Sequence, residues 1–416
     1  MSNKPGYKPS PLGMIPQEWE VYKIGELLSK GILVDHLDGN HGELYPRSEE
    51  FVSTGVPYLS ANNFFNGYVD FNSCKFLHPE RAKQFRKGIA KNGDVLFAHN
   101  ATVGPVAILN TELEYVVLST TATYFRCNPN LLSNLYLREY FTSDYFINQY
   151  SRVMGQSTRN QVPITTQRKF YTILPKLSEQ KKIASILYCW DEAILYTQQI
   201  LYKLLERNKG LTLQLLTGKK KLKGFNKPWK EIHLAEAFIE RNETGYLNLD
   251  LLSVGSLGIY PQSQSEKRDT SNSDKAKYKR ICPGDIGYNT MRMWQGRSAL
   301  SSLEGIVSPA YTIVTPKENQ YSKFYAYLFR LPSVINKFFR NSQGLVEDTL
   351  NCKFKDFAKV KVEVPEYEAQ VAIANILNTA HFEIKAYEQK LFALQHQKKG
   401  LMQKLLTGEV RVKIEG

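Results

Sequence analysis

The sequence lacks the features of a disulfide-bonded, zinc-binding or membrane protein. Its five cysteines are scattered and none forms a CxxC pair, so neither a disulfide framework nor a zinc site is expected. No run approaches the ~20 apolar residues that cross a bilayer. The opening MSNKPGYKPSPLG has no apolar core of the kind that secretory signals contain. We therefore expect a cytoplasmic protein with reduced thiols and no membrane partner.

Motifs of catalysis are also missing. The sequence contains no NPPY or DPPY adenine-binding motif, no GxxxxGK[ST] phosphate loop and no HExxH metal motif. Asp94 and Asp285 each follow a glycine at the start of an apolar run, which is ordinary turn chemistry. We predict a chain without catalysis that binds no cofactor or metal of its own.

What the sequence does have is length and positive charge. Its 416 residues are more than one ordinary core needs and suit two or three domains. Lys and Arg number 54 against 40 Asp and Glu, a formal net charge of +14. Such an excess attracts polyanions, although charge alone does not choose among DNA, RNA and an anionic membrane.

An internal repeat is the strongest signal. Leu174–Gly218 aligns without gaps on Val364–Gly408, and 17 of the 45 positions are identical. Weaker matches lie upstream, where the sequence around Trp19 resembles that around Trp229, and Gly93-Asp94 resembles Gly284-Asp285. The order along the chain is therefore a globular segment, a helix, a second globular segment and a second helix.

Each repeated segment has the heptad spacing of a coiled-coil strand. We expect the two helices to pair with each other in antiparallel fashion, because one narrow apolar seam cannot bury itself. The seam also has one polar position common to both copies, Asn208 and Lys398, which would help to fix the register. A coiled coil that serves oligomerisation alone is the alternative, but it leaves the paired globular segments unexplained. The predicted helix-pairing residues are Ile183, Leu187, Ile194, Leu201, Leu204, Leu211, Leu215, Ile373, Leu377, Ile384, Leu391, Leu394, Leu401 and Leu405.

The globular segments mix short β-rich runs with helical stretches, which indicates an α+β fold class. We expect two globular mixed α/β domains separated by a long antiparallel two-helix coiled coil with a pseudo-twofold repeat. The predicted divisions are 1–173 for the first domain, 174–218 for the central helix, 219–363 for the second domain and 364–416 for the C-terminal helix and tail. We call the globular domains reader 1 and reader 2.

Amide, arginine and aromatic side chains cluster in the predicted loops of both readers. Asn and Gln can bind adenine through two hydrogen bonds, and Arg can bind guanine in the same way. For any single Asn or Gln, however, a turn-forming or surface role competes, and Trp294 is as consistent with a core position as with a contact. The candidate DNA-binding residues are Asn62, Asn63, His99, Asn100, Arg159, Asn160 and Gln161 in reader 1, and Tyr288, Asn289, Arg292, Trp294, Gln295 and Arg297 in reader 2.

The arrangement resembles the specificity (S) subunits of type I restriction–modification systems over nearly the whole chain. The features that carry the resemblance are the tandem repeat, the entry around Trp19, and helices that open with P-x-x-x-x-Q and close with KGL…LLTG. The stretch NTMRMWQG followed by EGIVSPAY in reader 2 is similar to sequences of such target recognition domains.

The resemblance implies a non-catalytic subunit that binds a bipartite, asymmetric target on double-stranded DNA. Each reader would be a target recognition domain, and the helices would set the gap and dock two modification (methyltransferase) subunits. Restriction (ATP-dependent translocase/nuclease) subunits would join the complex. S-adenosylmethionine and ATP/Mg would be bound by the partners.

Three alternatives stay open. They are an enzyme, a scaffold that binds DNA only through its phosphates, and the specificity subunit of a fused or modification-only system. A scaffold of the second kind would bind all sequences equally and with a steep salt dependence.

Overall fold

The chain forms two compact units. The computed structural model describes residues 5–39, 44–155, 160–255, 258–264, 274–344 and 349–414. Unit 1 comprises Met1–Gln198 and Lys390–Gly416, and unit 2 comprises Gln199–Gln389. Each unit therefore contains one reader, the first part of the helix that follows it and the last part of the other helix. The boundaries between the two compact units therefore fall within both long helices, whereas the domains predicted from the sequence kept each helix whole.

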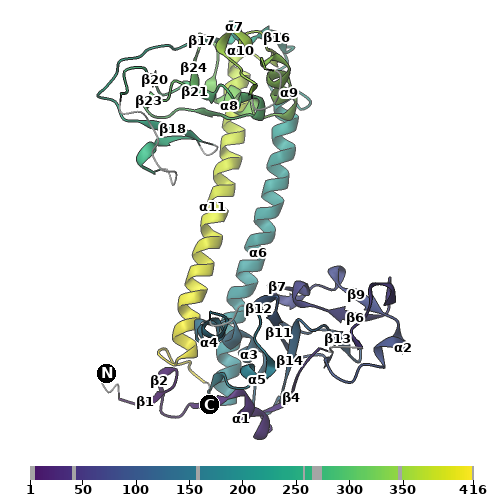
Figure 1. Ribbon diagram of the computed structural model, residues 1–416. Coiled ribbons are helices and arrows are strands. Elements are labelled where there is room, and N and C mark those ends of the chain that lie inside the picture. Colours follow the sequence, from purple (N-terminus) through teal and green to yellow (C-terminus); the bar gives the residue numbers. More distant parts are fainter. Residues whose placement is uncertain are drawn as a thin grey trace. The chain divides into compact units, whose positions relative to one another are not determined.

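Reader 1 is built on two sheets (Figure 1). A six-stranded sheet has the order β4-β14-β11-β12-β8-β7, and a five-stranded sheet has the order β10-β13-β6-β9-β5. The strands of the first sheet are β4 (Leu33–Asp38), β7 (Phe64–Phe65), β8 (Gly67–Val69), β11 (Val95–Asn100), β12 (Thr102–Ile108) and β14 (Ala122–Cys127). Those of the second are β5 (Phe51–Val52), β6 (Val56–Leu59), β9 (Lys75–Leu77), β10 (Ile89–Ala90) and β13 (Val116–Leu118).

Short helices and two further strand pairs complete reader 1. The helices are α1 (Ile24–Ser29), α2 (Pro79–Ala82), α3 (Asn134–Phe141), α4 (Asp144–Met154) and α5 (Ile164–Gln167). Strand β1 (Tyr7–Ser10) pairs with β2 (Gly13–Pro16), and β3 (Glu20–Lys23) pairs with β15 (Tyr171–Leu174). Phe97 of β11 packs in one core with Phe141 of α3 and Phe146 of α4, so these helices cover one face of the larger sheet.

Reader 2 is a smaller version of the same plan. Its main sheet has the order β17-β24-β21-β22, and three strand pairs surround it, namely β16-β25, β18-β19 and β20-β23. The main sheet consists of β17 (Phe238–Glu240), β21 (Ile286–Asn289), β22 (Ser298–Leu300) and β24 (Tyr311–Pro316). The pairs consist of β16 (Lys230–His233), β25 (Lys361–Val364), β18 (Leu252–Gly255), β19 (Gly258–Pro261), β20 (Lys279–Ile281) and β23 (Gly305–Val307). The helices are α7 (Leu234–Ala237), α8 (Ser322–Leu328), α9 (Pro332–Asn341) and α10 (Phe354–Phe357).

The two repeated segments are single long helices, α6 (Leu177–Leu216) and α11 (Tyr367–Leu406). Within unit 1, Arg411, just past α11, pairs with Glu179 of α6, and Lys398 of α11 pairs with Asp191 of α6. Residue numbers therefore rise along α6 in the direction in which they fall along α11. Within unit 2, Arg207 pairs with Glu383, while Leu215 shares a core with Ile373. The helix contacts inside each unit are therefore antiparallel, and the expected fold class is confirmed.

None of the fourteen predicted helix-pairing side chains is exposed. Eight are buried, namely Ile183, Leu187, Leu204, Leu215, Ile373, Leu377, Ile384 and Leu405. Six are partly buried, namely Ile194, Leu201, Leu211, Leu391, Leu394 and Leu401. None of the helices in the described part of the chain carries the long apolar stretch that a membrane crossing needs.

The glutamines of the P-x-x-x-x-Q motifs anchor each long helix to its reader. Gln180 Nε2 donates to the carbonyl of Pro175 at 2.9 Å, and Gln370 Nε2 donates to that of Pro365 at 3.0 Å. The Gln180 side-chain oxygen accepts from the backbone N–H of Ser133, which caps α3. Gln370 accepts in the same way from Tyr321, the residue before α8. Both glutamines are buried, so this motif is structural.

Tryptophan and glycine join each reader to the end of the other repeat's helix. Gly408, just past α11, has a φ of +70°, and a Cβ there would approach Trp19 to 3.2 Å. Gly218, just past α6, has a φ of +68°, and its Cβ would approach Trp229 to 3.3 Å. Both glycines thus end their helices in the left-handed conformation and permit a close aromatic contact. In unit 1 this contact brings together two segments that lie far apart in the sequence.

Candidate nucleic-acid interface

Both main sheets contain one central strand with the same course. Strand β11 follows Gly93-Asp94 and ends at Asn100, while β21 follows Gly284-Asp285 and ends at Asn289. Each lies between two antiparallel neighbours, β14 and β12 in reader 1 and β24 and β22 in reader 2. The weak sequence match at Gly-Asp is therefore a true structural equivalence, and several of the candidate residues lie at the far ends of the two equivalent strands.

The aspartate at the start of each strand is held by an arginine. In reader 1, Arg126 Nη2 donates to Asp94 at 2.7 Å, and the backbone N–H of Lys91 donates to the same carboxylate at 2.7 Å. Burial raises the pKa of Asp94, although these hydrogen bonds oppose that rise. The expectation that Asp94 has a turn and structural role agrees with this geometry.

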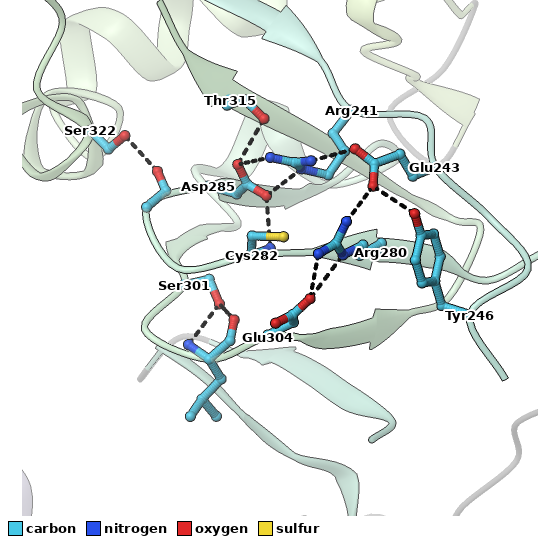
Figure 2. Close-up of polar contacts among 12 residues, drawn as sticks. Arg241, Glu243, Tyr246, Arg280, Cys282, Asp285, Ser301, Glu304, Thr315 and Ser322 are labelled. Carbon is cyan, nitrogen blue, oxygen red and sulfur yellow. Dashed lines mark hydrogen bonds and ion pairs between the residues drawn. The ribbon is translucent and has the colours of Figure 1, made fainter. Parts of the chain in front are cut away.

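In reader 2 the equivalent aspartate, Asp285, is also bound by an arginine, which directly follows β17 (Figure 2). Arg241 Nε donates to Asp285 at 2.8 Å, and the backbone N–H of Cys282 donates to the same carboxylate at 2.8 Å. The hydrogen bond to Asp285 is the main cause that raises the pKa of Arg241. Glu243 links Arg241 to Arg280, which also binds Glu304. This network fixes the start of β21.

In reader 1 the two loops that were predicted separately come together. The backbone N–H of Ala101 donates to Asn160 O at 2.9 Å, and that of Val162 donates to His99 O at 2.7 Å. Asn100 and Gln161 form an antiparallel bridge. Ala101 adopts a φ of +62°, in the left-handed region, at the turn between β11 and β12. Asn100 and Gln161 are half-buried and Asn160 is exposed, so three amide side chains are placed at one loop pair.

Other reader 1 candidates are divided between surface and interior. Asn62 is exposed, whereas Asn63 is 3% exposed and accepts hydrogen bonds from Ser60 N and Oγ, which marks it as a turn residue. His99 is 5% exposed and belongs to the interior of the sheet. Arg159 lies outside the described residues.

In reader 2, four of the six candidates line one open cavity of about 260 Å³. Asn289, Arg292, Gln295 and Arg297 lie there with Val254, Gly255 and Tyr311. The other two candidates point elsewhere. Tyr288 is fully buried and stacks on Phe357, with ring centroids 5.2 Å apart. Trp294 is half-buried, donates its Nε1 hydrogen to Met291 O and packs against Phe339.

Sequence reasoning missed the segment that faces the β21 loop. Cys352 N donates to Thr290 O at 2.8 Å, in the same way as Val162 N donates to His99 O in reader 1. Gln343 and Asn351 form an antiparallel bridge beside it. The offset that aligns the two long helices maps Gln161 onto Asn351, so extending the repeat through the readers would have located these residues. Val254, Gly255 and Tyr311 come from distant strands and had no such signal.

Comparisons with known proteins agree with this geometry. A family model described as the type I restriction modification DNA specificity domain matches residues 16–206. A putative type I restriction enzyme MjaX specificity subunit from Methanocaldococcus jannaschii is 23% identical and aligns over 98% of this chain and 97% of its own.

Solved structures share the fold. The crystal structure of an HsdS subunit from Thermoanaerobacter tengcongensis matches with a TM-score of 0.50 at 16% identity, covering 95% of this chain and 98% of that one. A type I restriction–modification S subunit from M. genitalium matches with a TM-score of 0.57 at 13% identity, covering 97% and 98%. These matches show that residues 16–206 form a type I restriction modification DNA specificity domain, and that the chain is similar over nearly its whole length to a type I restriction enzyme specificity subunit.

Proposed function

We propose that this chain reads a bipartite, asymmetric target on double-stranded DNA and has no catalysis of its own. The observation that carries the proposal is the pair of equivalent strand ends with different side chains. Reader 1 presents the amides Asn100, Asn160 and Gln161, and reader 2 presents a cavity with two arginines and two amides. Because hydrogen-bonding side chains discriminate among base edges, unlike sets favour unlike half-sites.

The long helices are proposed to set the gap between the half-sites. One rigid protein reads two half-sites only at the separation that it imposes, commonly near one DNA turn of ~34 Å. Helices of 40 residues span roughly 60 Å at ~1.5 Å per residue, which is ample for that purpose.

The same helices are proposed to dock two modification subunits. Tyr202 on α6 and Phe392 on α11 are 67% and 70% exposed, although both side chains are large and apolar. They occupy equivalent positions of the repeat, because the offset that aligns the two helices takes Tyr202 to Phe392. Because the two side chains occupy equivalent positions, they suit two copies of one partner, each contacting one of them. S-adenosylmethionine and ATP/Mg would be bound by the modification and restriction subunits.

Methylation sequencing of a host that carries the chain with its methyltransferase tests this function. The wild type should produce methylation in two half-sites separated by a constant gap. A variant with seven residues inserted after Gln198 and seven after Gln389 keeps the heptad phase and adds about 10 Å to each helix. We expect the same half-sites with a longer gap.

The matched control carries seven residues after Lys223, an exposed position between the end of α6 and β16, the first strand of reader 2. It should leave the gap unchanged. An unchanged gap in the helix variant would contradict the spacing role, and wild-type methylation without sequence preference would favour a protein that contacts phosphates alone.

A further inference from the structure

We infer that Arg297 binds a guanine in the half-site that reader 2 contacts, with Gln295 beside it. The inference rests on the proposed function and makes it specific to one residue and one base. Arg297 is an exposed residue that lines the 260 Å³ cavity, at the end of the loop that connects β21 to β22. Four observations carry it, namely the rigidity of the loop, its support, the charges nearby and the chemistry of the lining.

The loop from Asn289 to Arg297 is closed on itself by backbone hydrogen bonds. Asn289 N donates to Arg297 O at 3.1 Å, and Arg297 N donates to Arg292 O at 3.3 Å. Within the loop, Gln295 N donates to Arg292 O at 3.0 Å, and Gly296 N donates to Met293 O at 2.8 Å. The backbone N–H and C=O of Arg297 are therefore both hydrogen-bonded within the loop. A backbone that is already ordered loses less conformational entropy when a ligand binds.

Side chains beneath the loop keep it in place. Met293 is fully buried, and a Cβ on Gly296 would come within 2.8 Å of Ile335 of α9. Gly296 also has a φ of +74°, so this position requires glycine. Such support is what a recognition side chain needs, because a loosely held contact discriminates poorly.

Arg297 differs from the structural arginines of reader 2 in its charge partners. Figure 2 shows Arg241 and Arg280 bound to carboxylates of Asp285, Glu243 and Glu304. Arg297 is exposed, and its guanidinium has no hydrogen bond or ion pair with any other described residue. Its donors are thus open to a ligand.

The chemistry of Arg297 favours guanine at the position that this side chain contacts. Guanine presents two acceptors, O6 and N7, which match the two parallel donors of a guanidinium. The described lining contains no carboxylate, the group that best accepts from the amino group of cytosine. The volume is also below the ~300 Å³ of the smallest ordinary small-molecule pockets, which suits the edge of a base pair better than a free cofactor.

Duplex binding by the complex with its methyltransferase tests the inference. Each guanine of the methylated target is replaced in turn by adenine in its pair, and separately by 7-deazaguanine, which lacks the N7 acceptor. At one guanine the wild type should lose roughly 5- to 150-fold in affinity with the base-pair change. The Arg297→Ala variant should bind both targets about equally and be insensitive to 7-deazaguanine there. Arg297→Lys should retain part of the preference, because lysine offers a point charge instead of a fork.

Arg340→Ala is the matched control, since Arg340 is an exposed arginine at the end of α9 in the same reader. It removes the same charge and should weaken all targets alike. Thermal unfolding checks that each variant is folded. If Arg297→Ala and Arg297→Lys keep every guanine preference while the wild type still methylates a bipartite target, the inference is wrong and the proposed function stands. A wild type without a bipartite target refutes the proposed function instead.

Discussion

At the scale of single residues, the interior of reader 1 holds an unusual histidine. His36 is 1% exposed, its Nε2 lies 3.1 Å from Gln167 Oε1, and its ring stacks on Phe125. Burial lowers the pKa of His36 from 6.5 to about 4; Arg168 and His99 add to this, while Gln167 and Asp38 oppose it. The folded protein therefore keeps this imidazole neutral at pH values where the unfolded chain would protonate it.

This predicts a loss of stability in mild acid. Between pH 6.5 and about 4 the unfolded chain binds the proton and the folded chain does not, so the contribution of His36 is complete above pH 6.5 and falls as the pH is lowered. The loss should reach on the order of 3 kcal/mol near pH 4. Urea unfolding at several pH values should show a shallower pH dependence for His36→Gln than for the wild type. The exposed His381→Gln serves as control, and equal slopes for all three proteins would contradict the prediction.

For some candidate residues, the sequence did not predict whether the side chain is buried or exposed. Tyr288 and Asn289 are neighbours in one predicted recognition motif, yet Tyr288 belongs to the core and Asn289 lines the cavity. Successive side chains of a strand point to opposite faces, and the sequence does not say which face is covered. Asn63 likewise looked like a base reader until its hydrogen bonds to Ser60 became visible.

At the scale of elements, a buried ion cluster ties α11 to reader 1. Lys398 Nζ lies 2.9 Å from Glu139 of α3 and 2.7 Å from Asp191 of α6, and Arg138 contacts both carboxylates. The side chains of Arg138 and Glu139 are 4% and 1% exposed. The equivalent position in the first copy of the repeat is Asn208, so the same lysine cluster does not form in unit 2.

Replacing Lys398 by methionine should destabilise unit 1 by roughly 3 kcal/mol, because the buried Glu139 and the partly buried Asp191 would then share one arginine. Adding Glu139→Gln to that variant should recover part of the loss. Lys399→Met is the control, since Lys399 is 65% exposed and, among the described residues, forms an ion pair with Asp144 alone at 3.3 Å. Exposed pairs contribute ~0–1 kcal/mol. Chemical unfolding measures all three, and similar effects at both lysines would argue against the cluster.

The heptad pattern predicted the helices and marked Lys398 as a polar seam position. It did not reveal the cluster, because Arg138 and Glu139 come from α3, which lies outside the two long helices. Periodicity reports which face of a helix is covered, whereas the covering partner depends on the tertiary fold. Lys398 therefore contacts side chains of both α3 and α6, and its register-fixing role stays a prediction.

At the scale of the whole molecule, the repeat predicts the number of partners. Tyr202 and Phe392 occupy equivalent, exposed positions, and each would contact one modification subunit. We expect native mass spectrometry to find two methyltransferase copies on the wild type. A single Tyr202→Ala or Phe392→Ala change should weaken one of them, and the double change should weaken both. The exposed Leu213→Ala on α6 is the control, and loss of both copies from one single variant would contradict independent sites.

Unit 1 is formed by two segments that are far apart in the sequence, which affects how it folds during translation. Its reader is translated well before α11, yet its core includes Met402, Leu405 and Leu406 of that helix. Unit 2 is one continuous segment, Gln199–Gln389, and can close earlier. During synthesis the part of this core that Met402, Leu405 and Leu406 complete therefore stays uncovered until α11 has been translated. Nascent chains of this protein should depend on chaperones at that stage, when such a surface invites aggregation.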